Sequence, residues 1–218
     1  MDDTAKFKGI NMSFLEASWE ERETTSYKAL LGDTGPGIFP LSHALFKRMN
    51  ASDIAPRWLT HGVFKSPPNS NRNTWAYITS GMSNPWETDE PEEYSGLGVE
   101  FLMETEKDET WAVEVLQMLM AYNLLLAAGQ MGDFPLLGDG DRVPLALSDA
   151  IRTMMFTEPV SFPHCFNIKS GRVDLLQVVG ITPAELQVAK QTSSDEIRTQ
   201  LISKLGTLVT SKERESVV

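Results

Sequence analysis

Two serines and a glutamate are the residues of this chain that best suit acid–base chemistry on a small substrate. The segment WAYITSGMSNPWE, Trp75 to Glu87, begins with the β-branched and aromatic residues typical of a strand and ends abruptly in Gly and Asn-Pro. Ser80 and Ser83 lie at this end, and Glu100 lies in a second predicted strand. A glutamate in a concave pocket could act as a general base. One hypothesis is therefore an enzyme or small-ligand binder with a polar pocket near Ser80 and Glu100.

Other patterns that could carry out chemistry are incomplete. His43, His61 and His164 have no ligand partner at i+2 or i+4, so a zinc site is not indicated. Cys165 is next to His164, but adjacent residues of a strand point to opposite faces and cannot act together. Gly138–Asp141, GDGD, lacks the further ligands of a calcium loop and indicates a turn. We therefore predict no catalytic residue, no metal and no cofactor.

The composition is that of a globular, strongly acidic chain. It has 218 residues, of which 41% are hydrophobic and 22% charged, so it can bury a core. The 30 acidic and 19 basic residues give a formal net charge of −11, which argues against binding to nucleic acid or to an anionic membrane. The sequence shows no secretory leader and no membrane span, and its single cysteine excludes an internal disulfide framework. We expect a cytoplasmic protein.

Many of the acidic residues gather in two short segments. One interpretation is that they keep exposed loops solvated, and the other is that their field attracts a basic partner. The two segments contain Glu87, Asp89, Glu90, Glu92 and Glu93, and Glu104, Glu106, Asp108 and Glu109.

Strands and helices must position these residues, and their signals are interleaved along the chain. Predicted strands cover residues 57–64, 74–80, 97–105 and 171–180, with short candidates at 152–156 and 164–168. Predicted helices cover residues 13–31, 41–49 and 111–129, and two more begin after the capping residues Thr182 and Ser193. Because several successive strands have no helix between them, the pattern indicates an α/β (α+β) domain with a mixed β-sheet packed against helices.

Motif order along the chain resembles that of the suppressor-of-fused domain family. The motifs are WAYITSGMSNPWE, SGLGVEFLMET, WAVEVLQMLMAY, MMFTEPV and VDLLQVVGITPAELQVAK, and together they cover roughly residues 56–205. Family members carry a Tyr-x-(Thr/Ser)-x-Gly-(Met/Leu)-Ser strand end and a Gly-x-Glu-(Leu/Phe) strand. They also carry a Leu-Gln-(Val/Ile)-Val-Gly strand that is followed by Thr-x-x-Glu-Leu. One departure is Asn84, where the family often has aspartate.

The resemblance implies a single suppressor-of-fused-like domain at residues 51–206. A helical segment at residues 1–50 would pack on this domain, and a polar tail at residues 207–218 would be frayed. Animal members are signalling regulators that hold a transcription-factor peptide as an added strand, clamped between this domain and a second one. We do not expect the clamp or the signalling role here. The chain resembles shorter bacterial members, some of which have been proposed as immunity proteins.

Residues at the strand end and on three other segments form the predicted binding site. In the functional interpretation, Tyr77, Ser80, Ser83 and Trp86 line a groove in which a peptide or loop could lie. In the structural interpretation, Gly81 allows a turn, Met82 and Trp86 fill the edge of the core, and the serines cap backbone groups. The predicted binding residues are Tyr77, Ser80, Met82, Ser83, Trp86, Glu100, Glu158 and Gln177.

The polar residues of this set also have a structural interpretation. Glu100 and Gln177 belong to apolar strands, so each needs hydrogen-bond partners if it is buried. A shared internal network would satisfy both. Glu158, in FTEPV, either anchors a loop or contacts a partner.

Three functional hypotheses follow. The first is a non-catalytic, cytoplasmic protein-binding module, more specifically an immunity protein that neutralises a basic toxin. The second is the enzyme or small-ligand binder near Ser80, with Glu100 as the base, and the third is a homodimer whose interface is the only recognition surface. Motif order, missing catalytic groups and the charge of −11 favour the first, because acidic proteins associate quickly with basic partners.

Overall fold

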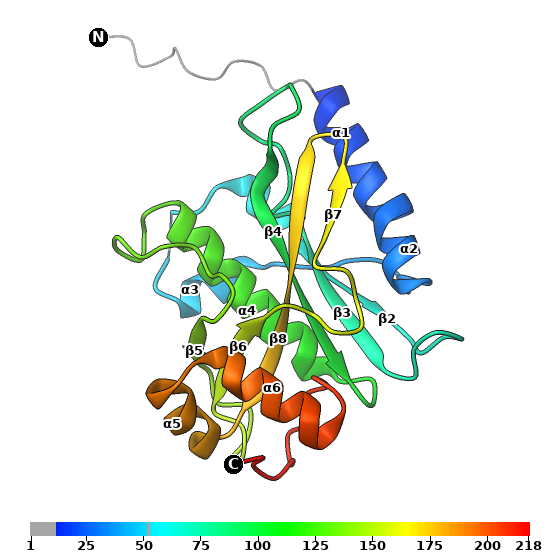
Figure 1. The fold of residues 1–218 in the computed structure, drawn as a ribbon. Coiled ribbons are helices and arrows are strands. Elements are labelled where there is room, and N and C mark those ends of the chain that lie inside the picture. Colours follow the sequence, from blue (N-terminus) through cyan, green and yellow to red (C-terminus); the bar gives the residue numbers. More distant parts are fainter. Residues whose placement is uncertain (1–11, 52) are drawn as a thin grey trace.

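A twisted mixed β-sheet forms the centre of the molecule (Figure 1). The computed structural model describes residues 12–51 and 53–218. The strand order is β1-β2-β3-β4-β8-β6-β5, and β7 pairs with β8 outside this path. Strands β4 and β8 are parallel, and the other pairs are antiparallel. The strands are β1 (Phe39–Pro40), β2 (Gly62–Ser66), β3 (Trp75–Ser80), β4 (Tyr94–Thr105), β5 (Arg142–Pro144), β6 (Thr153–Thr157), β7 (Cys165–Ile168) and β8 (Gly171–Ile181).

Helices cover both faces of the sheet. Helix α4 packs on one face, whereas the N-terminal helices and the pair α5–α6 cover different parts of the other face. The helices are α1 (Met12–Glu20), the π-helical η1 (Glu21–Ser26), α2 (Tyr27–Leu31), α3 (His43–Arg48), the 3-10 helix η2 (Pro56–Thr60), α4 (Thr110–Ala127), α5 (Pro183–Gln191) and α6 (Ser194–Leu205). The mixed α/β architecture predicted from the sequence is therefore confirmed.

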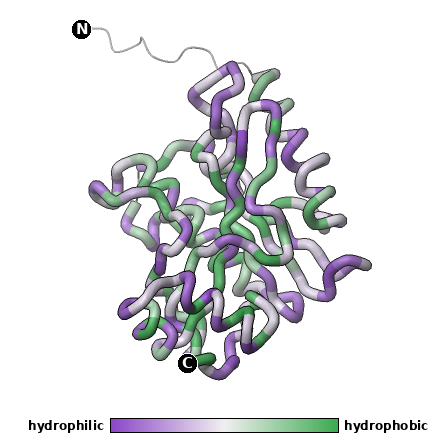
Figure 2. Tube along the Cα trace, viewed as in Figure 1, coloured by the Kyte–Doolittle hydropathy of each residue, from purple (hydrophilic) through white to green (hydrophobic). Residues whose placement is uncertain are grey.

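Alternation along the strands assigns residues to the two faces. Phe101 and Met103 of β4 join the cluster around α4, and Leu102 between them joins the cluster around α2. Strands β3 and β4 are antiparallel neighbours, with Trp75 opposite Thr105. Both features agree with the sequence prediction. Figure 2 shows that the protruding β3–β4 connection, which holds the first acidic segment, is mostly hydrophilic.

Two local predictions differ from the structure. The strand expected at residues 57–64 begins only at Gly62, because Pro56 starts a turn of 3-10 helix that occupies the preceding residues. The single helix expected at residues 13–31 contains six π-helical residues, Glu21–Ser26. A π-helical turn changes the direction in which side chains leave the helix, and such turns are frequent at functional sites.

The N-terminal helices and the C-terminal tail are both attached to the sheet. Tyr27 and Leu31 are buried in the cluster around α2, while residues 1–11 of the expected helical segment lie outside the described residues. The expectation of a frayed tail is corrected, because Leu208 and Val217 are buried and the Thr210 N–H donates to the Glu104 carbonyl at 2.9 Å.

Helix α4 is the apolar centre of the fold. By length and composition alone its 18 residues could cross a membrane, but 61% of them are buried inside the structure. Leu116, Met120 and Leu124 are among the side chains that pack against the sheet. The core helix of a globular protein has the same length and composition, which is the role that α4 has here.

Candidate functional site

The turn after β3 is built around the carboxylate of Glu100. Its Oε1 accepts hydrogen bonds from the Gly81 N–H at 2.9 Å, the Ser83 N–H at 3.0 Å and the Ser83 hydroxyl at 2.7 Å. Its Oε2 accepts from the Thr79 hydroxyl at 2.6 Å. The residue has no exposed surface. Glu100 therefore satisfies the backbone donors that the strand end leaves unpaired.

Two residues of η1 occupy the place where we expected an open groove. The Arg22 guanidinium, which is completely buried, donates to Ser83 Oγ at 3.1 Å and to Asn84 Oδ1 at 2.6 Å. Glu23 accepts from the Ser80 hydroxyl at 2.7 Å. The expected groove is thus filled by Arg22 and Glu23 of the chain itself. Asn84 stands where related sequences often have aspartate, and its neutral amide oxygen accepts the hydrogen bond from Arg22.

Gly81 permits the tight approach of a histidine to this turn. Its φ is +133°, and a Cβ placed on it would lie 2.4 Å from Cγ of His61. The His61 ring is nearly parallel to that of Trp86, with the centroids 6.1 Å apart, and the Arg57 guanidinium lies 5.4 Å from the Trp86 centroid. This close packing explains why a core strand ends in glycine, small hydroxyl residues and tryptophan.

Acid should destabilise the fold through His61. Burial lowers its pKa to about 3, and the charge of Arg22 acts in the same direction. An unfolded histidine has a pKa of about 6.5, so neutral His61 gives stability that is complete above pH 6.5 and is lost as the pH falls. We expect a slope of up to about 1.4 kcal/mol per pH unit from this proton.

The measurement is urea unfolding of the wild type and His61→Phe between pH 7 and pH 5. The free-energy difference between the two proteins should shrink as the pH falls, because the variant lacks the titrating group. His43→Phe, at an exposed position of α3, should keep the wild-type slope. Equal slopes for the wild type and His61→Phe would contradict the assignment.

The other predicted residues are dispersed over the fold. The Tyr77 hydroxyl accepts from the Glu109 N–H at 2.7 Å on the α4 face, and Met82 is buried near Asn123. Gln177 is buried on the opposite face, and Glu158 is half exposed with an ion pair to His164 at 3.1 Å. The structure brings together Ser80, Ser83 and Glu100, with Trp86 beside them, and separates the rest.

Sequence reasoning missed the two N-terminal residues of this network. Arg22 stands in an acidic, helical stretch, Glu-Glu-Arg-Glu, that reads as a solvated face. Burial of an arginine depends on the tertiary position of Glu100, which is far away in the sequence. The enzyme hypothesis loses the base that it required, because Glu100 is enclosed and its oxygens accept four hydrogen bonds.

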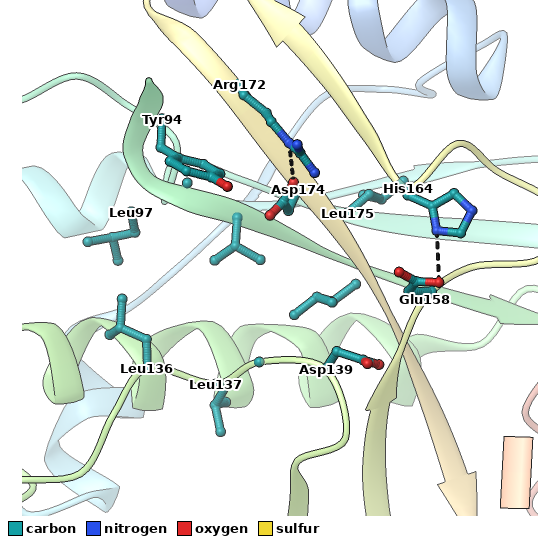
Figure 3. Close-up of a pocket in the computed structure, with 14 residues that line it drawn as sticks. Tyr94, Leu97, Leu136, Leu137, Asp139, Glu158, His164, Arg172, Asp174 and Leu175 are labelled. Atoms are coloured by element: carbon teal, nitrogen blue, oxygen red, sulfur yellow. Dashed lines mark hydrogen bonds and ion pairs between the residues drawn. The ribbon is translucent and has the colours of Figure 1, made fainter. Parts of the chain in front are cut away.

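An open hollow of about 410 Å³ lies elsewhere, on the α4 side of β4 and β8 (Figure 3). Leucine side chains from β4, β8 and the loop after α4 form its apolar part. Two ion pairs border it: Arg172 with Asp174 at 2.7 Å, and His164 with Glu158. We call this hollow the acidic groove, and its lining consists of Tyr94, Leu97, Gly98, Val99, Leu136, Leu137, Gly138, Asp139, Glu158, His164, Arg172, Asp174, Leu175 and Leu176.

One exposed aromatic side chain lines the acidic groove. Tyr94 belongs to its lining and is 40% exposed. An exposed aromatic group beside a concave apolar surface is typical of protein-interaction sites.

Charge around the groove is predominantly negative. Asp139 is exposed on its rim and has no hydrogen bond or ion pair within residues 12–51 and 53–218. The first acidic segment runs directly into Tyr94, and all five of its acidic residues are exposed. The described residues contain no group of three His, Cys, Asp or Glu side chains arranged to hold a metal ion.

Solved structures of suppressor-of-fused proteins have the same fold as this chain. A crystal structure of a Sufu–Fu complex matches with a TM-score of 0.58 and 19% identity, over 80% of this chain and 88% of that one. Drosophila Suppressor of Fused gives 0.57 and 20%, over 80% of this chain and 49% of that one. The putative homologue from Neisseria gonorrhoeae FA 1090 gives 0.53 and 20%, over 72% and 78%. At these identities the likeness shows the fold.

Membership of a family follows from the sequence match. The family model described as Suppressor of fused protein (SUFU) matches residues 58–215. The chain therefore belongs to the suppressor of fused family, as the order of its motifs predicted. No curated protein sequence matches the chain.

Proposed function

We propose that this chain is a non-catalytic protein-binding module that holds a basic segment of its partner in the acidic groove. The observation that carries the proposal is an apolar hollow that is bordered by the exposed ring of Tyr94 and by carboxylates. A relative crystallised as a Sufu–Fu complex supports a protein partner. Apolar groups of the partner would fill the hollow, and its lysines or arginines would meet Asp139 and Glu158.

The specific role that we propose is that of a cytoplasmic immunity protein that neutralises a basic toxin. The formal charge of −11 supports this role, because opposite net charges accelerate association. Such a protein must bind faster than the toxin reaches its target. Electrostatic steering supplies that speed and makes the association rate fall steeply with salt.

The test is affinity capture from a lysate of the native host, followed by binding kinetics with the captured protein. We expect Asp139→Lys/Glu158→Lys to reduce capture by at least about tenfold, because it reverses two charges on the rim. The control Glu16→Lys/Glu20→Lys makes the same change in charge on exposed residues of α1, a helix that contributes no residue to the lining of the groove. It should capture the partner nearly as well as the wild type.

Three results would overturn the proposal. They are an acidic captured protein, equal losses for both double variants, and an association rate that does not change with salt. Coexpression then tests the immunity role: the captured protein should be toxic to the host by itself and harmless beside the wild-type chain.

A further inference from the structure

The chain itself contains a short basic segment with the chemistry that the acidic groove selects. Residues 5–11, which precede α1 and lie outside the described residues, have the sequence AKFKGIN. Lys6 and Lys8 flank Phe7, and the segment has no acidic residue. A phenyl ring between two ammonium groups is the combination that suits an apolar hollow bordered by carboxylates.

Contacts of Lys169 place the start of α1 at the same end of the sheet as the groove. Helix α1 begins at Met12, and the Lys169 ammonium lies 5.2 Å from the centroid of the Phe14 ring. Lys169 belongs to the turn between β7 and β8, three residues before Arg172 of the groove. Figure 1 shows the start of α1, this turn and the β3–β4 connection at one end of the molecule. The chain that precedes Met12 is therefore attached close to the groove.

Two side chains of the groove form its near rim, toward α1. The Arg172 guanidinium lies 5.8 Å from the centroid of the Tyr94 ring. A Cβ placed on Gly171 would lie 2.6 Å from the carbonyl oxygen of Glu92, so the β7–β8 turn packs closely against the connection that leads into β4. Figure 3 shows Tyr94 and Arg172 on one side of the leucine side chains and Asp139 on the other. The far rim therefore carries a carboxylate.

The segment is long enough to cross the near rim. An extended chain spans about 3.5 Å per residue, so Phe7, five residues before Met12, extends roughly 17 Å from the start of α1. One side chain, that of Lys169, is sufficient to bridge the gap between Phe14 and the turn next to the rim. A span of this length brings Phe7 to the hollow, with Lys6 beyond it.

Asp139 is the carboxylate of the groove that a new cation can pair with at the lowest cost. Asp174 is already paired with Arg172, and Glu158 with His164. Asp139 is exposed and has no ion pair within residues 12–51 and 53–218. The hollow beside it is apolar, so an occupant that brings a cation and an aromatic ring next to each other satisfies both parts of the groove.

We propose that residues 5–11 occupy the acidic groove of the same chain and compete there with the partner. Phe7 fills the hollow, Lys6 pairs with Asp139, and Lys8 lies over the carboxylates next to Tyr94. A short tether gives the segment an effective concentration on the order of 1 mM, so a weak intrinsic affinity is sufficient. The competition rests on the proposed function, whereas the occupancy rests on the groove alone.

The experiment is photo-cross-linking of the full chain with p-benzoylphenylalanine in place of Phe7. Irradiation of the purified protein, followed by proteolysis and mass spectrometry, identifies the residues that the ring contacts. A mixture of isotopically labelled and unlabelled chains distinguishes links within one chain from links between two copies. We expect links within one chain to the leucines of the hollow, which are Leu136, Leu137, Leu175 and Leu176.

Charge reversal on the rim tests what directs the segment. Asp139→Lys/Glu158→Lys should reduce the yield of these cross-links by at least about fivefold, because it places two cations where Lys6 binds. The control Glu114→Lys/Glu215→Lys makes the same change in charge outside the groove and should keep the original yield. All four positions are exposed, so none of these changes disturbs the core.

Competition is measured with the captured partner. Lys6→Gln/Lys8→Gln should raise the affinity for the partner about fivefold, because the groove is then free in a larger fraction of the molecules. The control Lys47→Gln/Lys190→Gln makes the same change in charge at exposed positions of α3 and α5. It should leave the affinity unchanged, and an equal gain in both double variants would show that net charge alone is responsible and would overturn the competition.

Cross-links that join two copies, or that map to a surface other than the groove, would overturn the occupancy. Equal yields in Asp139→Lys/Glu158→Lys and its control would do the same, because charge would then not direct the segment. The cross-linking uses the chain alone. It can fail while a partner is still captured, and it can succeed when no partner is found, so the failure of one proposal is distinguishable from the failure of the other.

Discussion

Replacement of Glu100 by alanine should destabilise the fold by about 4 kcal/mol, among the largest losses for any single substitution. The variant leaves the buried N–H groups of Gly81 and Ser83 without an acceptor. It also removes a nearby buried anion from Arg22, which is linked to Glu100 through the Ser83 hydroxyl. Urea unfolding followed by tryptophan fluorescence measures the loss. Glu114→Ala, at an exposed position of α4, is the matched control and should change stability by less than about 0.5 kcal/mol.

A loss of about 4 kcal/mol is a large share of the stability of a typical domain, so Glu100→Ala could fail to fold. Two less disruptive variants test the same network. Glu100→Gln keeps one acceptor oxygen and removes the charge, so we expect a loss of about 2 kcal/mol. Arg22→Met should cost less in the Glu100→Gln protein than in the wild type, with a coupling of at least about 1 kcal/mol. Strictly additive losses would mean that Arg22 and Glu100 do not stabilise each other.

Local sequence patterns predicted the framework around this network but not the network itself. Alternation in β4 placed Phe101 and Leu102 on opposite faces, and the capping pattern at Thr182 and Glu185 located the start of α5. These features depend on neighbouring residues, so they can be read from the sequence. The connection between Glu100 and Arg22 through Ser83 cannot be read from the sequence. It depends on the π-helical turn that directs Arg22 to the end of β3, which is far away in the sequence.

The polar residues at the end of β3 also led to a wrong prediction of an open groove. Ser80 and Ser83 looked like the lining of a site because small hydroxyl residues are rare in core strands, yet both serve a buried ion network. The acidic groove depends on Leu136, Tyr94 and Asp174, which no single motif connects. The parallel pairing of β4 with β8 brings Tyr94 and Asp174 to one surface, and the loop after α4 adds Leu136 to it. Neither the pairing nor the position of this loop can be read from local sequence patterns.

The same limitation applied to the C-terminal tail, whose polar composition hid a buried ion pair. Arg214 Nη1 and Nη2 each lie 2.5 Å from an oxygen of Glu185, a carboxylate with no exposed surface. The Val217 N–H donates to the same carboxylate at 2.9 Å. The tail is therefore held at the start of α5 by charge-assisted hydrogen bonds, which are the strongest kind in a protein interior.

Arg214→Met should therefore destabilise the protein by about 3 kcal/mol at pH 7, because it leaves Glu185 charged and buried without its cation. Burial alone raises the pKa of Glu185, but the hydrogen bonds from Arg214, Thr182 and Val217 outweigh it and lower the pKa. In the wild type, the ionised carboxylate therefore gives stability above the unfolded pKa of about 4.3, and this stability is lost as the pH falls. The variant loses the hydrogen bonds and the charge of Arg214, both of which lower the pKa of Glu185, so its Glu185 should take up a proton at a higher pH than in the wild type.

The difference in the free energy of unfolding between the wild type and Arg214→Met should therefore be largest near pH 7 and should decrease toward pH 4. Urea unfolding at several pH values measures it. Arg152→Met removes an exposed ion pair with Asp149 and should cost less than about 0.5 kcal/mol at every pH. If the tail were frayed, Arg214→Met would cost as little stability as Arg152→Met at every pH. A large difference in the free energy of unfolding at pH 7 that becomes smaller in acid would show that the tail is part of the folded domain.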